Sequence, residues 1–178
     1  MSFMGSRVRR VVQQIARRAG HARSFARMGR LLVPADRLVA RLTGGRVIAL
    51  GVLPSLLITT TGRRSGQPRT NPLLYVPDGD AFVVIGSNWG QRHQPAWALN
   101  LIANPAATVT VKGSQIPVRA RVTSGAERDR LWQLLVEQWP AYETYVRRAG
   151  DRKIPIFRLE PVSASVEARV TPDQRTPR

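Results

Sequence analysis

The spacing of apolar residues divides the chain into a helical N-terminal part and a longer part built of short strands. From Val8 to Ala22 apolar side chains recur at three- and four-residue steps, with paired arginines mostly on the opposite side. This spacing predicts a basic amphipathic helix. A second helix is predicted over residues 35–42, because two glycines, Gly44 and Gly45, follow it.

After Pro54 the pattern changes to runs of β-branched and apolar residues separated by turn residues, which is typical of strands. The expected strands are residues 55–61, 70–76, 81–87, 107–112, 115–122 and 154–159, and the expected helices are residues 94–103, 126–138 and 142–148. Five to six mostly antiparallel strands with inserted helices indicate a mainly β (α+β) fold, a small barrel. The expected organisation is a basic N-terminal extension (1–46), a barrel domain (47–162) and a loose polar tail (163–178).

Charge adds a possible partner to this picture. The 178 residues contain 28 Lys and Arg against 11 Asp and Glu, a formal net charge of +17, and residues 1–46 hold eleven arginines with one acidic residue, Asp36. The helix within residues 7–30 either lies on an anionic membrane surface or packs on its own domain with a solvated basic face. A nucleic-acid-binding module is the less favoured use of this charge, because no groove-reading motif is present.

Several classes of protein are excluded by composition. The chain has no cysteine and two histidines, His21 and His93, which leaves no disulfide scaffold, no cysteine nucleophile and no expected metal site. No apolar run reaches the roughly 20 residues that span a bilayer, and no signal-peptide pattern follows the early arginines. We expect a cytoplasmic protein, with a peripheral position on the inner face of the cell membrane as the alternative.

The strongest local feature is the arginine turn TTGRRSGQPR, residues 60–69. Its two glycines permit a tight hairpin, and Arg63, Arg64 and Arg69 together can bind phosphate or carboxylate groups. The alternative is an ordinary solvated turn. Motifs for nucleotide binding, metalloproteases and serine hydrolases are absent, so a bound cofactor is the more economical source of reactivity.

Three further features allow both a structural and a functional interpretation. The segment IGSNWG, residues 85–90, is a strand-to-helix loop that offers backbone amides and a hydroxyl, or is only a connection. Trp97 and Asn100 share a helix face, for ligand contact or for packing. Trp139, Tyr142 and Tyr145 form an aromatic stripe that is either core or a lid whose phenols donate a proton.

Taken together, the motifs resemble the deazaflavin (coenzyme F-420)-dependent nitroreductase and quinone reductase family of actinobacteria. The resemblance covers about residues 30–161 and rests on LLITTTGRRSGQPRTNPLLY, FVVIGSNWG, PAWALNLIANP and WPAYETYVRRAGDRKIPIFRLEP, in the family's order. It implies a split β-barrel. It also implies an oxidoreductase that transfers a hydride from reduced coenzyme F-420 to a quinone, a nitroaromatic or another activated acceptor.

The resemblance further implies the site residues. Tyr142, with Ser87 and Tyr145 nearby, would protonate or orient the acceptor. The residues implied to hold the coenzyme, an 8-hydroxy-5-deazaflavin, are Arg63, Arg64, Ser65, Arg69, Thr70, Asn71, Pro72, Leu73, Leu74, Ile85, Gly86, Ser87, Asn88, Ala96, Trp97, Ala98, Leu99 and Asn100. FMN is the runner-up cofactor, and a non-catalytic F-420-binding protein is the other alternative. The oligomeric state is not predicted.

Overall fold

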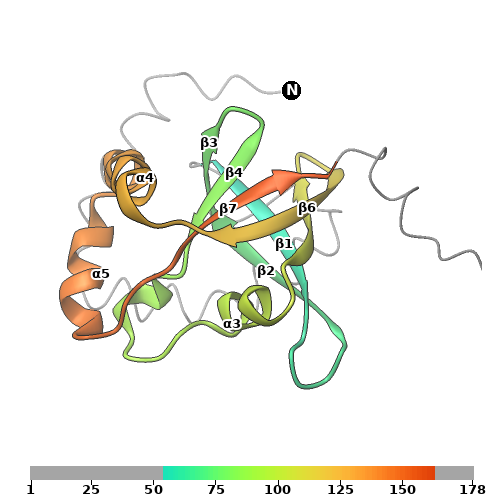
Figure 1. The fold of residues 1–178 in the computed structure, drawn as a ribbon, viewed down its shortest axis with the longest axis horizontal. Helices are drawn as coiled ribbons and strands as arrows, with labels where there is room; N and C mark the ends of the chain where they lie inside the picture. Colours follow the sequence, from blue (N-terminus) through green and yellow to red (C-terminus); the bar gives the residue numbers. More distant parts are fainter. Residues whose placement is uncertain (1–53, 163–178) are drawn as a thin grey trace, which may run out of the picture.

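A single curled antiparallel sheet organises residues 54–162, the part of the chain that this computed structural model describes. Seven strands follow the order β2-β1-β5-β6-β7-β4-β3, and every neighbouring pair is antiparallel (Figure 1). The strands are β1 (Ser55–Thr61), β2 (Pro68–Leu74), β3 (Val76–Asp78), β4 (Ala81–Ile85), β5 (Ala106–Val111), β6 (Ser114–Val122) and β7 (Ile156–Pro161). Short hairpin turns connect β1 to β2, β3 to β4 and β5 to β6, which is why consecutive strands pair.

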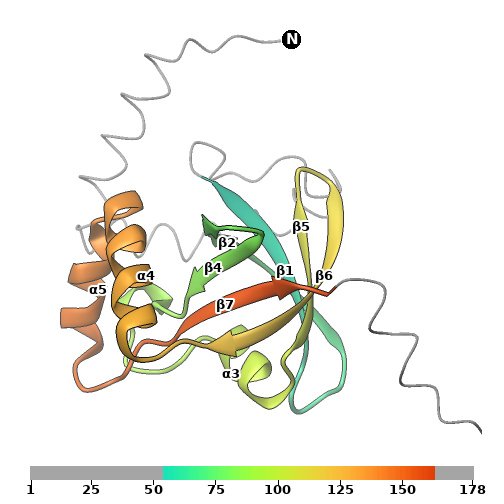
Figure 2. The same cartoon turned by 45° about the horizontal axis from the view of Figure 1, so that its top comes forward.

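Three α-helices and one short 3-10 turn complete the described fold. They are η1 (Asn88–Gly90), α3 (Ala96–Ala103), α4 (Gly125–Gln138) and α5 (Ala141–Ala149). Helices α4 and α5 lie side by side at one end of the sheet, and α3 packs near β1 and β6 (Figure 2). Pro140 separates α4 from α5, because proline lacks the N–H that would continue the helical bonds.

The apolar residues form two cores that share strands β4 and β7. Val83 and Ile85 of β4 face the core under α4 and α5, whereas Val84 faces the core under α3. In β7, Ile156 and Phe157 divide between the two cores in the same way. This division follows from the two-residue period of a strand, and it explains why β4 (AFVVI) is a continuous apolar run, whereas β7 (IFRLEP) keeps polar residues at Arg158 and Glu160.

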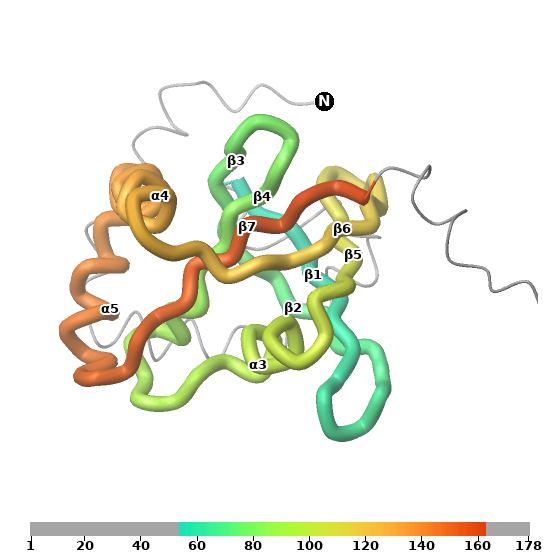
Figure 3. The backbone as a smooth tube through the Cα atoms, viewed as in Figure 1, coloured from blue at the N-terminus to red at the C-terminus, as the bar shows by residue number. Residues whose placement is uncertain are grey.

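The two edges of the sheet are consecutive in the chain. β2 forms one edge and β3 the other, and Tyr75 is the single residue between them. The backbone N–H of Tyr75 donates to the carbonyl of Pro54 at 3.2 Å. The smooth trace in Figure 3 shows how the chain curls so that these two strands come from one continuous segment.

Comparison with the sequence predictions confirms the fold class and corrects several boundaries. The expected strand 70–76 is wrong as one element: its residues belong to β2, which pairs with β1, and to β3, which pairs with β4. The described sheet therefore has seven strands instead of five to six. Helix α3 starts at residue 96 and not at 94, because Pro95 disfavours the helical conformation of the residue before it.

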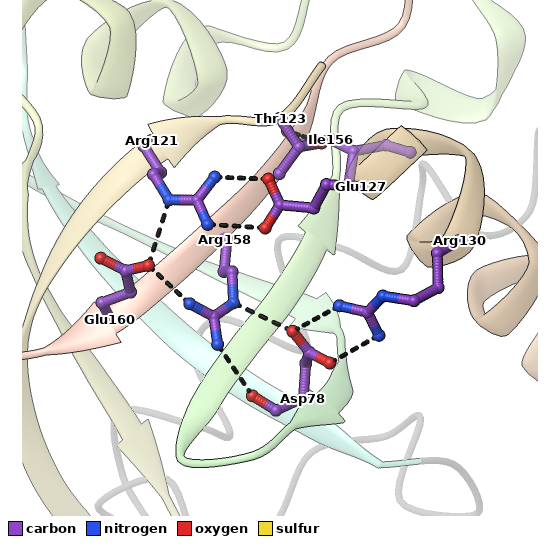
Figure 4. A network of polar contacts seen from close by, with 8 residues as sticks. All are labelled: Asp78, Arg121, Thr123, Glu127, Arg130, Ile156, Arg158 and Glu160. Atoms are coloured by element: carbon purple, nitrogen blue, oxygen red, sulfur yellow. Dashed lines mark hydrogen bonds and ion pairs between the residues drawn. The ribbon is translucent and has the colours of Figure 1, made fainter. Parts of the chain in front are cut away.

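Ion pairs connect α4 to the sheet (Figure 4). Asp78 accepts hydrogen bonds from Arg130 of α4 at 2.8 and 3.0 Å and from Arg158 of β7 at 2.9 Å. Glu160 and Glu127 continue the network through Arg121, at 3.1 Å and 2.6 Å. These guanidinium partners hold the pKa of the Asp78, Glu127 and Glu160 carboxyls below their usual range. The network joins the β3–β4 hairpin, β6, β7 and α4 into one unit.

Some predictions concern residues outside the described part of the chain. These are the helices before Pro54, the extension 1–46 with its membrane contact, and the tail 163–178. Within residues 54–162 no helix is long and apolar enough to cross a membrane. In the same residues no three His, Asp or Glu side chains gather in a way suited to a metal ion.

Candidate active site

The arginine turn forms a tight, exposed hairpin between β1 and β2. The N–H of Gly62 donates to the carbonyl of Gln67 at 2.8 Å, and Gly66 adopts a φ of 65°, which favours glycine. A Cβ at Gly62 would lie 2.8 Å from the Ser65 hydroxyl, so this position requires glycine as well.

The cationic side chains of this turn have no carboxylate partner within residues 54–162. Arg63, Arg64 and Arg69 are exposed, and the one side-chain contact among them is a 3.5 Å hydrogen bond from Arg69 to the Ser65 hydroxyl. Three guanidiniums within seven consecutive exposed positions repel one another unless an anion lies between them. The turn is therefore well suited to a ligand that carries several negative charges.

Asn100 ties α3 to this turn. Its side chain is 5% exposed; its amide donates to the Thr60 hydroxyl at 3.0 Å, and its carbonyl oxygen accepts from the backbone N–H of Arg63 at 3.1 Å. Both polar atoms of the side chain thus have partners in the protein. These bonds fix the start of the arginine turn, and the contact of Asn100 with the cofactor stays a prediction.

The remaining candidates of α3 and β2 lie close to the same turn. Trp97 is 6% exposed, and its ring packs 5.6 Å from Phe157, so the ring belongs to the core. Ala98 is fully buried, whereas Ala96 is exposed and Leu99 is intermediate. The candidates of β2 are half-buried along an edge strand: Thr70, Asn71, Pro72, Leu73 and Leu74. Proline is tolerated there because an edge strand has one unpaired side.

The loop after β4 has an unusual backbone. Asn88, Trp89 and Gly90 have φ values of 46°, 55° and 76°, a left-handed conformation that costs free energy at the two residues that are not glycine. A Cβ at Gly90 would lie 2.8 Å from the Cβ of Arg148, and one at Gly86 would lie 2.9 Å from Pro155. The loop is therefore packed tightly against α5 and the segment before β7.

The tyrosine pair of α5 is buried beside this loop. Tyr142 and Tyr145 are 5% and 2% exposed, with ring centroids 6.1 Å apart, and the ring of Trp89 lies 6.0 Å from that of Tyr145. Burial raises the pKa of both hydroxyls above the usual value for tyrosine. Both phenols therefore keep their protons to a higher pH than an exposed tyrosine does. No hydrogen-bond acceptor for the Tyr142 hydroxyl is found among residues 54–162.

The candidates thus fall into two groups. Arg63, Arg64, Ser65, Arg69 and Asn100 surround the hairpin turn, while the loop from Ile85 to Asn88 lies beside Tyr145. Helix α3 follows the loop directly in the chain and connects the two groups.

One residue of the site was missed from the sequence. Arg152 bonds four groups within residues 86–94, at separations of 58 to 66 positions along the chain. No local pattern links partners so far apart. In the sequence, Arg152 follows Asp151 in a charged loop and resembles an ordinary surface residue.

The fold and the site define a split-barrel protein with an anion-receptive hairpin turn and a buried tyrosine pair. The chain belongs to the F420H(2)-dependent quinone reductase family, whose family model matches residues 34–161. A protein of Mycobacterium tuberculosis described as an F420H(2)-dependent quinone reductase is 37% identical over 111 residues, which are 61% of this chain and 74% of that protein.

Solved structures agree with this assignment. The structure of an F420-H2 dependent reductase, FDR-A, superposes with a TM-score of 0.56 at 37% identity, covering 60% of this chain and 94% of that one. Another, described as a domain-swapped dimer, has a TM-score of 0.57 at 33% identity and covers 71% of this chain and 96% of that one. The predicted split-barrel class is confirmed.

Proposed function

We propose that this protein is an oxidoreductase that transfers a hydride from reduced coenzyme F-420 to a quinone. The single observation that carries the proposal is the exposed arginine turn, whose three guanidiniums have no carboxylate partner within residues 54–162, in a chain of the F420H(2)-dependent quinone reductase family. A coenzyme with a phosphodiester and several carboxylates matches that cluster in charge and in hydrogen-bonding type.

The donor set of the site suits such a coenzyme. Arg63, Arg64 and Arg69 would hold the phosphate and the carboxylates, and Ser65 adds a hydroxyl beside Arg69. The half-buried residues of β2 and the loop from Ile85 to Asn88 would hold the rest. The predicted alternative, FMN, carries one phosphate and would leave part of the positive charge of the turn without a counter-ion.

When bound, coenzyme F-420 supplies the hydride through its reduced deazaflavin ring. The residues of this chain bind the coenzyme, orient the acceptor and donate a proton to it. Burial keeps the hydroxyl of Tyr142 protonated, so it can donate a proton or a hydrogen bond to the acceptor oxygen. Ser87 provides a second hydroxyl on the neighbouring loop, and the ring of Tyr145 packs at a tilt against that of Trp89.

The acceptor range is a further part of the proposal. The family supports a quinone; nitroaromatics and other activated acceptors are proposed as secondary substrates, because a protonated donor next to the ring assists the reduction of any polarised oxygen. Contact of residues 7–30 with an anionic membrane stays a prediction, and it would bring the site close to lipid-soluble quinones.

The first test is a titration of the purified full chain with coenzyme F-420, followed by addition of menadione to the reduced complex. We expect saturable binding and menadione-dependent reoxidation. Binding without reoxidation would support a non-catalytic carrier instead, and no binding would contradict the proposal.

Replacement of Arg69 tests the arginine turn. Loss of one charge-assisted contact should weaken F-420 binding at least about tenfold in Arg69→Ala. Arg119→Ala, an exposed arginine of β6, is the matched control and should bind like the parent. Equal affinity of the two variants would remove the turn from the binding site.

Replacement of the buried phenol tests the proton donor. Tyr142→Phe keeps the ring and its packing, and we expect the turnover number to fall by about a hundredfold or more at unchanged F-420 affinity. Tyr75→Phe, outside the proposed site, is the control. Parent-like turnover of Tyr142→Phe would exclude this residue as the donor.

A further inference from the structure

Arg152, in the connection between α5 and β7, makes an unusual set of hydrogen bonds. Its Nε donates to the carbonyl of Gln91 at 2.8 Å, and its Nη2 donates to that of Ser87 at 2.7 Å. Its Nη1 donates to the carbonyl of Gly86 at 2.9 Å and to Oε1 of Gln94 at 2.8 Å. Figure 1 shows the connection from α5 to β7 passing beside the segment between β4 and α3.

No acidic partner within residues 54–162 forms an ion pair with this guanidinium. The charge is half-buried and is compensated by carbonyl dipoles, and its desolvation lowers the pKa of Arg152 from the ordinary value for arginine. The amide of Gln94 donates in turn to the carbonyl of Lys153 at 2.8 Å. A planar guanidinium that bonds three carbonyls of one loop fixes the conformation of that loop.

The direction of the peptide groups follows from these bonds. In a trans peptide the C=O and the N–H of the same plane point in opposite directions. Because the carbonyls of Gly86 and Ser87 both point at Arg152, the N–H groups of Ser87 and Asn88 point away from it. Neither N–H has a hydrogen-bond acceptor among residues 54–162. Both residues are partly exposed, so these two donors are open to a ligand.

The loop would not hold this conformation without support. Asn88 and Trp89 both adopt positive φ, which costs about 1–3 kcal/mol at each residue that is not glycine. Within the loop, the N–H of Gly90 donates to Ser87 at 2.9 Å and that of Gln91 to Asn88 at 3.0 Å, and the side-chain amide of Asn88 donates to the carbonyl of His93 at 3.0 Å. Arg152 supplies four of the hydrogen bonds that tie this loop to the rest of the described structure, and Gly86 and Gln94 add bonds to the carbonyls of Pro155 and Lys153.

We propose that Arg152 is a positioning residue, which fixes the peptide groups at 86–88 so that the N–H groups of Ser87 and Asn88 donate to acceptor atoms of the bound coenzyme. The ligand half of this inference rests on the proposed function. The restraint of the loop is a property of the ligand-free protein and is tested separately.

The experiment combines hydrogen exchange with cofactor binding in the full chain. In Arg152→Met the side chain keeps its apolar stem and loses all four bonds. We expect exchange of peptides covering residues 86–94 to accelerate at least about tenfold in the ligand-free protein, with residues 55–74 unchanged. We expect the Kd for F-420 to rise at least about tenfold. Arg152→Lys, which keeps the charge and fewer donors, should be intermediate in both measurements.

Arg158→Met is the matched control, since Arg158 is also a half-buried arginine near β7 but bonds Asp78 and Glu160. It should leave both the exchange at 86–94 and the Kd at parent values. Unchanged exchange in Arg152→Met would overturn the restraint, and faster exchange with a parent-like Kd would overturn the role in coenzyme binding.

Two further results distinguish a failure of this inference from a failure of the variant to fold and from a failure of the proposed function. If Arg152→Met does not fold, Gln94→Ala and Arg152→Lys carry the test, and parent-like exchange and affinity in both would overturn it. If the parent itself fails to bind F-420, the proposed function fails and the ligand half with it, whereas exchange at 86–94 still decides whether Arg152 restrains the loop.

Discussion

Asn100 has partners within the protein that its position in the sequence does not indicate. Its position three residues after Trp97 predicted a shared helix face for ligand contact. The structure uses the Trp97 ring for packing against Phe157 and the Asn100 amide for bonds to Thr60 and Arg63. Helical spacing predicts that the two side chains share one face of α3. The groups that contact Asn100 on that face lie 37 to 40 positions away in the chain, in β1 and the arginine turn.

Removal of the Asn100 amide should therefore affect both stability and binding. Asn100→Ala removes the acceptor of the Arg63 N–H and leaves the buried Thr60 hydroxyl with only its 3.4 Å bond to the Arg69 carbonyl, and we expect a loss of about 1–3 kcal/mol in the free energy of unfolding. F-420 affinity should also fall, because the start of the arginine turn is no longer fixed. Urea denaturation and fluorescence titration measure the two effects.

Asn104 supplies the control for this prediction. Its side chain accepts one bond from the N–H of Ala106 at 3.1 Å in an exposed position. Asn104→Ala should lose less stability and keep parent affinity for F-420. A stable Asn100→Ala variant that binds like the parent would contradict the role assigned to this residue.

At the level of elements, the sequence predicts the strands and hairpins, but it does not predict where the chain leaves one neighbouring strand and pairs with another. The prediction of β1 as residues 55–61 is confirmed to the residue, because β-branched residues are flanked by clear turn signals. The run after the arginine turn reads as one strand, yet its residues pair first with β1 and then with β4. A two-residue period reports which face a side chain takes, and it carries no information on which strand lies alongside.

The ion-pair network predicts how α4 depends on the β3–β4 hairpin. Asp78→Asn removes the charge that binds both Arg130 and Arg158, so we expect a lower urea midpoint than for Glu127→Gln, whose carboxylate forms an ion pair with Arg121 in the described structure. The difference should shrink as salt is added, because exposed pairs are screened. Equal midpoints at low salt would show that Asp78 contributes no more than a surface pair.

For the whole molecule, burial of Tyr142 and Tyr145 is expected to lower the free energy of unfolding at alkaline pH. Below a pH of about 10 the folded and unfolded states both keep the phenolic protons, so the pair contributes no pH dependence. Above it the unfolded state loses protons that the folded state retains, because burial raises the folded pKa of Tyr142 and Tyr145. The free energy of unfolding should then decrease as pH rises.

Thermal unfolding followed from pH 8 to pH 11 checks this limit. The melting temperature of the parent should fall above a pH of about 10, and Tyr142→Phe should show a shallower fall because one of the two groups is gone. Tyr75→Phe, at a half-buried position, is the control and should follow the parent. Parallel curves for all three proteins would mean that other groups set the alkaline limit.

The order of the strands has a consequence for how the barrel can deform. β2 and β3 are the two free edges of the sheet, and they are joined through Tyr75 alone. The covalent chain thus joins β2 to β3, although no hydrogen-bonded strand ladder connects them in the described sheet. The seam between these edges can widen without breaking any inter-strand ladder, while the peptide bonds at Tyr75 limit how far it opens. Any change in the separation of the two edges must therefore be taken up by the backbone torsion angles around Tyr75.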